Sequence, residues 1–157
     1  TVSNWQDVIL VNQQGERFWN EQDGRYDFFA AALSYSGDPE KLNGGGPIWA
    51  VFDADAVERE EWVPRPPNVD TDGYFFIADT IAELAGTISN PFQARPMSPE
   101  RLQATVSRYN TFVDSGEDRG FARPTPRYKI QRPPFYAAWS TPILHDSLTG
   151  LRTNQKA

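Results

Sequence analysis

Two side chains of this sequence lie where they could take part in acid–base or anion-binding chemistry. Arg25 follows Asn20 and Glu21 and falls where a helix is expected to begin, a position at which a positive charge opposes the helix dipole. His145 follows an apolar run and precedes a polar turn, so it could bind a substrate or act as an acid. A solvated surface arginine and a hydrogen-bonded turn histidine are the simpler interpretations of the two.

The glycine run at residues 44–46 does not have the placement of a phosphate-binding loop. Such a loop needs its glycines after a strand and before a helix, so that amides at the helix start meet the anion. Here the glycines precede Pro47 and an expected strand, and no G-x-G-x-x-G pattern occurs elsewhere. We therefore interpret residues 44–46 as a loop.

Hydrolytic chemistry has no specific support. His145, Asp146 and Ser147 are adjacent, and adjacent side chains rarely point at one another productively; a nucleophile elbow is also missing. No isolated carboxylate pair stands out among 21 acidic residues, as a glycosidase would require. Three of these acids indicate a solvated helix face: Glu58, Glu60 and Glu61.

Composition excludes several other classes of protein. Cysteine is absent and there is one histidine, so no disulfide framework, thiol catalysis or metal site is expected. The net charge of −6 disfavours nucleic acid as a partner. No apolar stretch is long enough to span a membrane, no basic run suits a membrane surface, and the first residues do not resemble a secretory signal. A cytoplasmic location is the expectation.

The length of 157 residues suits one domain over residues 1–157, and 39% apolar residues can form its core. Strands are expected at 8–12, 47–53, 73–77 and 134–139, with a hairpin turn at Gly15 returning through 17–19. The order of elements lacks βαβ alternation. The sequence therefore predicts an α+β domain with small, mostly antiparallel sheets and several helices.

Capping residues mark the expected helices. Ser98 before Pro99, an apolar stripe from Leu102 to Val113 and Gly116 at the end predict the clearest helix. Thr80 three residues before Glu83 has the spacing of a capping box. Further helices are expected after Asp53 or Asp55 as far as Trp62, and after Asp23 through Leu33; residues 117–134 are expected to form a loop.

Both ends of the sequence lie within or close to expected strands, at residues 9–12 and 151–154. This pattern suggests boundaries within a longer polypeptide. An ordinary small protein with ordered termini is the alternative interpretation.

Five segments, taken in order, resemble the capping domain of the fumarate reductase and succinate dehydrogenase flavoprotein superfamily, which includes 3-ketosteroid dehydrogenases. Residues 9–21 resemble its opening LVN-x-x-G-x-R-F-x-N-E. The other four segments resemble an I/V-F-D strand, an A-D-T-I-E-E-L-A helix, an L-x-x-T-V-x-x-Y-N-x-x-V-x-x-G helix and a P-P-F-Y-A…T-P-G-V-H-H-T-M-G-G-L strand: 47–53, 78–85, 102–116 and 133–150. Each match alone is weak, and their order makes them specific.

The resemblance implies a function and a set of site residues. In that family the capping domain is inserted into a Rossmann-like FAD-binding domain, which would be the partner of this chain within the same polypeptide. The reaction is hydride transfer between FAD and a C–C bond next to a carbonyl or carboxylate of a small-molecule substrate. Arg25, four residues after Glu21, falls on the family's proton donor, and His145 falls on a substrate-binding histidine. Four residues of the following turn would approach the flavin: Asp146, Ser147, Thr149 and Gly150. Alone, the chain is expected to lack both FAD and turnover.

Departures from the family pattern bear on the substrate. Asp146 replaces the second histidine of H-H, and its charge would repel a dicarboxylate. Aromatic residues near Arg25 would suit a larger apolar substrate, so fumarate is disfavoured and a ketosteroid or other enone stays open. A stand-alone binding domain with an aromatic contact surface is the alternative function.

Overall fold

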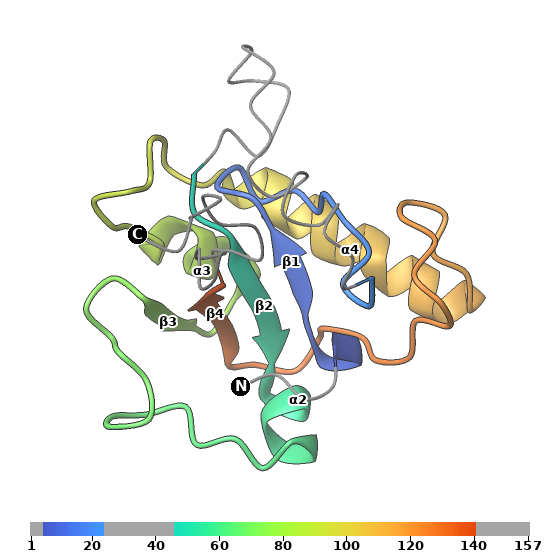
Figure 1. Ribbon diagram of the computed structural model, residues 1–157, viewed down its shortest axis with the longest axis horizontal. Coiled ribbons are helices and arrows are strands. Elements are labelled where there is room, and N and C mark those ends of the chain that lie inside the picture. Colours follow the sequence, from blue (N-terminus) through green and yellow to red (C-terminus); the bar gives the residue numbers. More distant parts are fainter. Residues whose placement is uncertain (1–4, 24–45, 141–157) are drawn as a thin grey trace, which may run out of the picture.

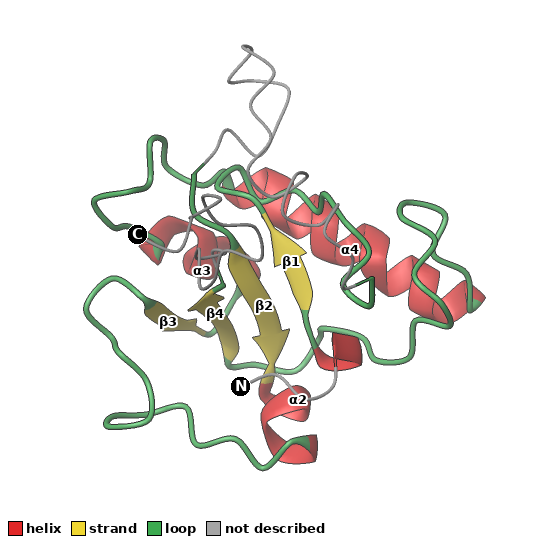
Figure 2. Ribbon diagram, viewed as in Figure 1, coloured by secondary structure: helices red, strands yellow, loops and turns green. Residues whose placement is uncertain are grey.

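The computed structural model describes residues 5–23 and 46–140. Within these ranges the chain forms an α+β fold, as predicted (Figure 1). The elements in chain order are a 3₁₀ helix η1 (Trp5–Asp7), β1 (Ile9–Val11), β2 (Trp49–Asp53), α2 (Ala54–Arg59), β3 (Phe75–Ala78), α3 (Ile81–Thr87), α4 (Pro99–Ser115) and β4 (Phe135–Trp139). Long loops join α2 to β3 and α4 to β4 (Figure 2).

The four strands of the described residues form one antiparallel sheet in the order β1-β2-β4-β3. The last strand, β4, lies between β2 and β3 and pairs with both: Val51 and Phe76 each lie opposite Ala137. Because every neighbouring pair is antiparallel, the end of β1, the start of β2, the end of β4 and the start of β3 meet at one end of the sheet.

Both faces of the sheet are buried. Side chains alternate between the two faces along each strand, so Trp49 and Val51 of β2 point one way and Phe52 the other. The first face packs against α3 and α4 through residues such as Leu84 and Leu102. The second face packs against α2 and the adjoining loop. This explains why the strands are continuous apolar runs rather than alternating ones.

The capping residues predicted for α3 and α4 are confirmed, whereas α2 ends at Arg59, before the predicted end at Trp62. Ser98 Oγ accepts a hydrogen bond from Arg101 N (3.2 Å), and Gly116 ends α4 with φ of 71°. Thr80 Oγ1 accepts from Glu83 N (3.1 Å) at the start of α3.

Asp53 links α2 to the loop that leads into β4. Its Oδ1 accepts a hydrogen bond from Ala56 N (3.1 Å), while its Oδ2 accepts from Gln131 N (2.8 Å) and Arg132 N (3.0 Å). The side chain is 1% exposed. A single carboxylate therefore caps a helix and satisfies two amides of a distant segment.

The predicted return strand at 17–19 is wrong. The turn forms, with φ of 86° at Gly15, but only an isolated bridge joins Val11 to Arg17. Beyond this bridge the Arg17 side chain forms ion pairs with Glu21 and Asp118 instead of continuing a strand. The 3₁₀ helix η1 was not predicted. The helix expected after Asp23 lies outside the described residues.

Replacing Asp53 with Ala is expected to destabilise the chain by about 3–7 kcal/mol. It removes a cap, worth about 1 kcal/mol, and leaves two further amides without an acceptor at about 1–3 kcal/mol each. Ser98→Ala is the control, because it removes the cap of α4 together with one exposed hydrogen bond to Glu100, and should cost about 1 kcal/mol. Urea unfolding of both variants measures the difference; equal losses would contradict the linking role of Asp53.

Candidate functional site

The six residues that the sequence assigns to a site all lie outside the described residues: Arg25, His145, Asp146, Ser147, Thr149 and Gly150. Their mutual placement stays a prediction. What the structure describes is the scaffold from which their segments depart, at Asp23 and Ser140.

The departure at Ser140 and the return of the chain at Gly46 share one end of the sheet. Ser140 N donates a hydrogen bond to Ile48 O (2.9 Å), one strand position beyond the Trp49–Trp139 pair. The chain that re-enters at Gly46 is therefore a neighbour of the chain that leaves at Ser140. The fold thus brings the end of one candidate segment beside the start of the other.

Hydrogen bonds between Gln13 and residues 93–94 lie at this end of the sheet. Gln13 Oε1 accepts a hydrogen bond from Ala94 N (2.9 Å), and its backbone oxygen accepts from Gln93 Nε2 (2.8 Å). A Cβ at Gly46 would overlap with Gln13 Nε2, so a larger residue there would displace the Gln13 amide from these contacts. These contacts fix where residues 24–45 rejoin the scaffold.

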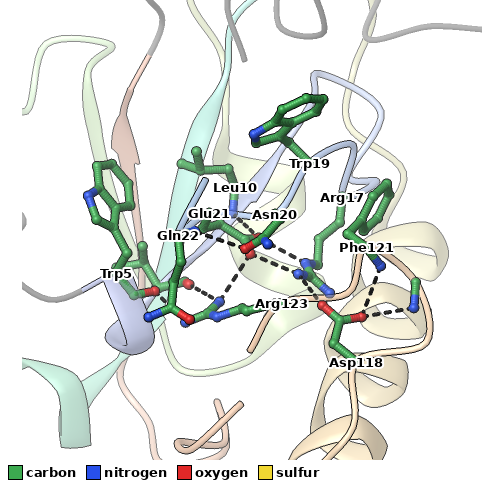
Figure 3. Close-up of polar contacts among 12 residues, drawn as sticks. Trp5, Leu10, Arg17, Trp19, Asn20, Glu21, Gln22, Asp118, Phe121 and Arg123 are labelled. Atoms are coloured by element: carbon green, nitrogen blue, oxygen red, sulfur yellow. Dashed lines mark hydrogen bonds and ion pairs between the residues drawn. The ribbon is translucent and has the colours of Figure 1, made fainter. Parts of the chain in front are cut away.

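A buried ion cluster lies beside β1, just before the other departure point (Figure 3). Arg17 binds Glu21 in a bidentate pair, through Nε to Oε1 and Nη2 to Oε2, both at 2.8 Å. The two side chains are 5% and 0% exposed. A planar guanidinium held this way fixes the direction of the carboxylate as well as its charge.

Arg123 joins the cluster from the loop after α4. Its Nη1 donates to Glu21 Oε2 (3.1 Å) and to Val8 O (2.9 Å), and its Nη2 donates to Trp5 O. The side chain is fully buried. A loop 100 residues away in sequence is therefore fastened to η1 and to the segment that ends at Asp23.

Asp118 is the second carboxylate of the cluster and pairs with Arg17. Its Oδ2 accepts from Arg17 Nη2 (2.8 Å), and its Oδ1 accepts from Gly120 N (2.9 Å) and Phe121 N (3.2 Å). Burial acts to raise the pKa of Asp118, but Arg17 and these amides outweigh it and hold the pKa below its usual range. The carboxylate therefore stays ionised opposite Arg17.

The ring of Tyr109 on α4 contacts both guanidinium groups. Arg17 Cζ lies 5.2 Å and Arg123 Cζ 5.3 Å from the ring centroid, within the range of cation–π attraction. Burial raises the pKa of Tyr109 to about 12. The Tyr109 hydroxyl is buried without a hydrogen-bond partner, so the ring rather than the hydroxyl is what the cluster uses.

An apolar cavity of about 460 Å³ opens on the sheet face away from α3 and α4. Aromatic residues dominate its lining, among them Trp5, Phe52, Trp62 and Phe75. Ser140 and Asn68 are its polar members, and none of its lining residues is ionisable. Such a cavity can accept an apolar body but offers no acid or base of its own.

Exposed aromatic rings extend this apolar surface beside Ser140. Trp139 contacts Tyr74 and Phe92 with ring centroids 5.4 Å and 5.8 Å apart. Phe92 is 60% exposed and Tyr74 37%. We call Tyr74, Phe92 and Trp139 the aromatic patch; exposed rings of this kind mark contact surfaces.

The helix starts of the described residues do not suit the phosphates of a dinucleotide. Phosphate binding at a helix start depends on free amides and a favourable dipole. Here carboxylates occupy or flank the three starts: Asp53 at α2, Asp79 and Glu83 at α3, and Glu100 at α4. None of the three described helix starts is therefore suited to the pyrophosphate of FAD.

Two further classes of site can be assessed in the same residues. No described group of three or more His, Asp or Glu side chains is arranged to hold a metal ion. No helix in the described part of the chain is long and apolar enough to cross a membrane.

Comparison with known proteins identifies the family. Residues 6–157 match the family described as FAD binding domain. The chain is 30% identical over 157 residues to the NADH:acrylate oxidoreductase of Vibrio harveyi, covering 97% of this chain and 14% of that protein. It is 30% identical over 172 residues to the 3-oxosteroid 1-dehydrogenase of Mycobacterium tuberculosis, covering 93% of this chain and 29% of that protein.

A solved structure supports the same relationship. The open conformation of a flavocytochrome c3 fumarate reductase superposes with a TM-score of 0.63 at 26% identity, over 84% of this chain and 20% of that one. This chain belongs to the fumarate reductase and 3-ketosteroid dehydrogenase family of flavoproteins, whose members bind FAD. It spans less than a third of the length of each of these three proteins.

Sequence reasoning missed the ion cluster. Arg17 and Glu21 belong to the motif that carried the resemblance, but their burial was not foreseen, and Arg123 lies in a segment rich in proline and arginine that indicates an exposed loop. The available clue was the motif itself, which keeps an arginine and a glutamate four residues apart where no helix is expected.

Tyr109→Phe is expected to leave stability unchanged or raise it by up to about 1 kcal/mol, because it removes an unpaired buried hydroxyl and keeps the ring. Tyr109→Leu also removes the ring that contacts both arginines, and should cost about 2–4 kcal/mol. Chemical denaturation of the two variants tests this. A loss on the Phe substitution as large as that on the Leu substitution would show that the hydroxyl matters.

Proposed function

We propose that this chain is the substrate-capping domain of an FAD-dependent oxidoreductase that acts on C–C bonds next to a carbonyl or carboxylate. The chain belongs to an FAD-binding family. The observation that carries the proposal is that its described residues form an antiparallel sheet and have carboxylates at the helix starts, which disfavours phosphate binding there. Its sequence also has no dinucleotide fingerprint. The nucleotide-binding part then belongs to another domain, and the role left to this one is to cover the substrate.

Arg25 and His145 are the residues through which the cap takes part. When bound, FAD supplies the hydride chemistry. Arg25 holds a proton for the substrate carbon next to the activating group, which requires its positive charge to lie near the developing carbanion. His145 binds the substrate carboxylate or carbonyl oxygen. Four residues would help to hold the flavin: Asp146, Ser147, Thr149 and Gly150.

The segments that contain these two residues meet the scaffold at neighbouring points, and a shared site for the two residues stays a proposal. The segment that contains Arg25 rejoins the sheet at Gly46, and the segment that contains His145 leaves it at Ser140, directly beside Ile48. The aromatic patch and the apolar cavity lie next to this exit. An apolar substrate such as a ketosteroid or another enone suits these surroundings better than a dicarboxylate.

The aromatic patch also favours a second function. A stand-alone interaction domain would use exposed rings such as Phe92, which is 60% exposed, to contact a partner protein. In the cap, the same rings would face the FAD-binding domain or the substrate.

The coding sequence on both sides of the segment separates the two functions. A strand followed by G-x-G-x-x-G upstream, and an FAD-closing strand and helix downstream, are expected for the cap. A start codon just before Thr1 together with a stop codon after Ala157 would leave the interaction domain instead.

Arg25→Ala in the full-length flavoprotein should lower turnover by about 100-fold or more, because a positioned proton donor contributes about 10²–10⁴ to the rate. FAD content, read from flavin absorbance, should not change. Arg119→Ala is the matched control, since the Arg119 side chain is 76% exposed and pairs only with Glu117. Turnover of Arg25→Ala close to that of the control would remove Arg25 from the mechanism.

A further inference from the structure

We propose that three residues of the apolar cavity determine which ligand it takes: Ala50 and Ala138, which leave the space, and Asn68, which is its hydrogen-bonding contact. The ligand class is a flat, uncharged, apolar molecule that carries a carbonyl oxygen. The proposal rests on the proposed function only in taking this molecule as the substrate. Binding to the cavity itself requires no FAD and is measured separately.

Two small residues open the cavity in a sheet face that is otherwise filled by large side chains. Ala50 of β2 lies directly opposite Ala138 of β4, and both belong to the face away from α3 and α4. The next pair on this face, Phe52 and Tyr136, is filled by two stacked rings with centroids 5.1 Å apart. Because an alanine side chain ends at Cβ, the row of large side chains is interrupted at the alanine pair. Both alanines line the space of about 460 Å³.

The loop between α2 and β3 supplies a second wall of the cavity (Figure 2). The Trp62 ring packs edge-on against Phe52 with centroids 5.0 Å apart, and Trp62 N donates a hydrogen bond to Val57 O (3.0 Å). At the other end of the loop, Asn90 Nδ2 donates to Gly73 O (3.1 Å). Both ends of the loop are therefore fixed before a ligand enters, which lowers the ordering cost of binding. The loop contributes these lining residues: Trp62, Val63, Pro64, Asn68 and Val69.

Asn68 brings hydrogen-bonding capacity to this wall. Its backbone is held, because Asn68 N donates to Arg65 O (2.9 Å). Its side-chain amide makes no hydrogen bond with any residue in the ranges 5–23 and 46–140. An amide both donates and accepts. It can therefore donate to a ligand carbonyl oxygen, which would otherwise lose its hydrogen bonds to water on entering apolar surroundings.

The cavity offers an ionised ligand no charge to pair with. None of its lining residues is ionisable. A carboxylate that leaves water for such surroundings loses its hydration without gaining a counter-charge, which is unfavourable. A flat ring system gains instead, because it packs against the faces and edges of aromatic side chains. The volume also falls within the range of about 300–1,000 Å³ that is typical of small-molecule sites.

Binding to the 157-residue chain is the first test, with progesterone as the neutral probe and fumarate as the charged one. Three tryptophans line the cavity, so tryptophan fluorescence should change saturably with progesterone and stay unchanged with fumarate: Trp5, Trp62 and Trp139. Ala138→Leu extends a side chain into the cavity and should weaken progesterone binding about tenfold or more. No saturable signal in the wild type, or unweakened binding in Ala138→Leu, would overturn the proposal.

Asn68→Ala tests the hydrogen bond. Asn68 is exposed, so the melting temperature should stay unchanged while progesterone binding weakens about 3–10-fold. Asn68→Asp keeps the size but cannot donate when ionised, and should weaken binding at least as much. Arg65→Ala is the matched control, because Arg65 is exposed on the same loop and does not line the cavity; its binding should stay within about twofold of the wild type. Equal binding by Asn68→Ala and Arg65→Ala would overturn the role of Asn68.

Turnover of the full-length flavoprotein separates this proposal from the proposed function. With progesterone as substrate and phenazine methosulfate as electron acceptor, Ala138→Leu should raise KM about tenfold or more. A wild-type KM in Ala138→Leu would overturn the cavity as the substrate's site and leave the flavoprotein function intact. Binding of progesterone that Ala138→Leu weakens, without turnover by the full-length protein, would support the cavity as a ligand site and overturn the proposed substrate instead.

Discussion

The fold depends on keeping four charged groups paired inside it. Arg17 and Arg123 bring two positive charges, Glu21 and Asp118 two negative ones, and the ring of Tyr109 lies against both guanidinium groups. Removing one partner of a buried pair leaves an uncompensated charge, at a cost of about 3–5 kcal/mol. The cluster therefore acts as one unit, and it joins η1, the turn after β1, α4 and the loop after α4.

This constraint gives a physical meaning to the motif shared with the flavoprotein family. Asn12 Oδ1 accepts hydrogen bonds from Gln14 N (2.9 Å) and Glu16 N (3.0 Å), which closes the turn after β1. Gly15 is required because its backbone, with φ of 86°, packs directly against Leu102 at the start of α4. Arg17 and Glu21 then carry the ion pair. The asparagine, glycine, arginine and glutamate of the motif thus form and fasten a turn, and residues that fasten a turn need not themselves react.

Local signals predicted the local structure, and long-range pairing was beyond them. Ser98, Thr80 and Asp53 mark helix starts because a cap is decided by the residue and its next few neighbours. The place of β4 between β2 and β3, and the burial of Arg123, depend on partners tens of residues away, and no spacing in the sequence encodes them. The strand expected at 17–19 was wrong for the same reason. Local β-propensity favoured a strand, but the Arg17 side chain pairs with Asp118, which is distant in sequence. The residues that the sequence assigned to the site lie outside the described part of the chain, so the resemblance remains their only basis.

The arrangement also explains how a rigid domain can serve reactive residues that it does not hold in its core. Loops carry function when the scaffold fixes their ends. Here the ends are fixed in chemically different ways: charged hydrogen bonds set the chain that leads to Arg25, whereas backbone pairing of Ile48 with Ser140 sets the chain that leads to His145. Ladder hydrogen bonds are made by any sequence that forms the sheet, so the second anchor tolerates substitution. The first depends on particular side chains. Under the proposed function, variation among relatives in substrate should therefore accumulate near Ser140 and the apolar cavity, while Arg17 and Glu21 stay constant because the turn after β1 depends on their ion pair.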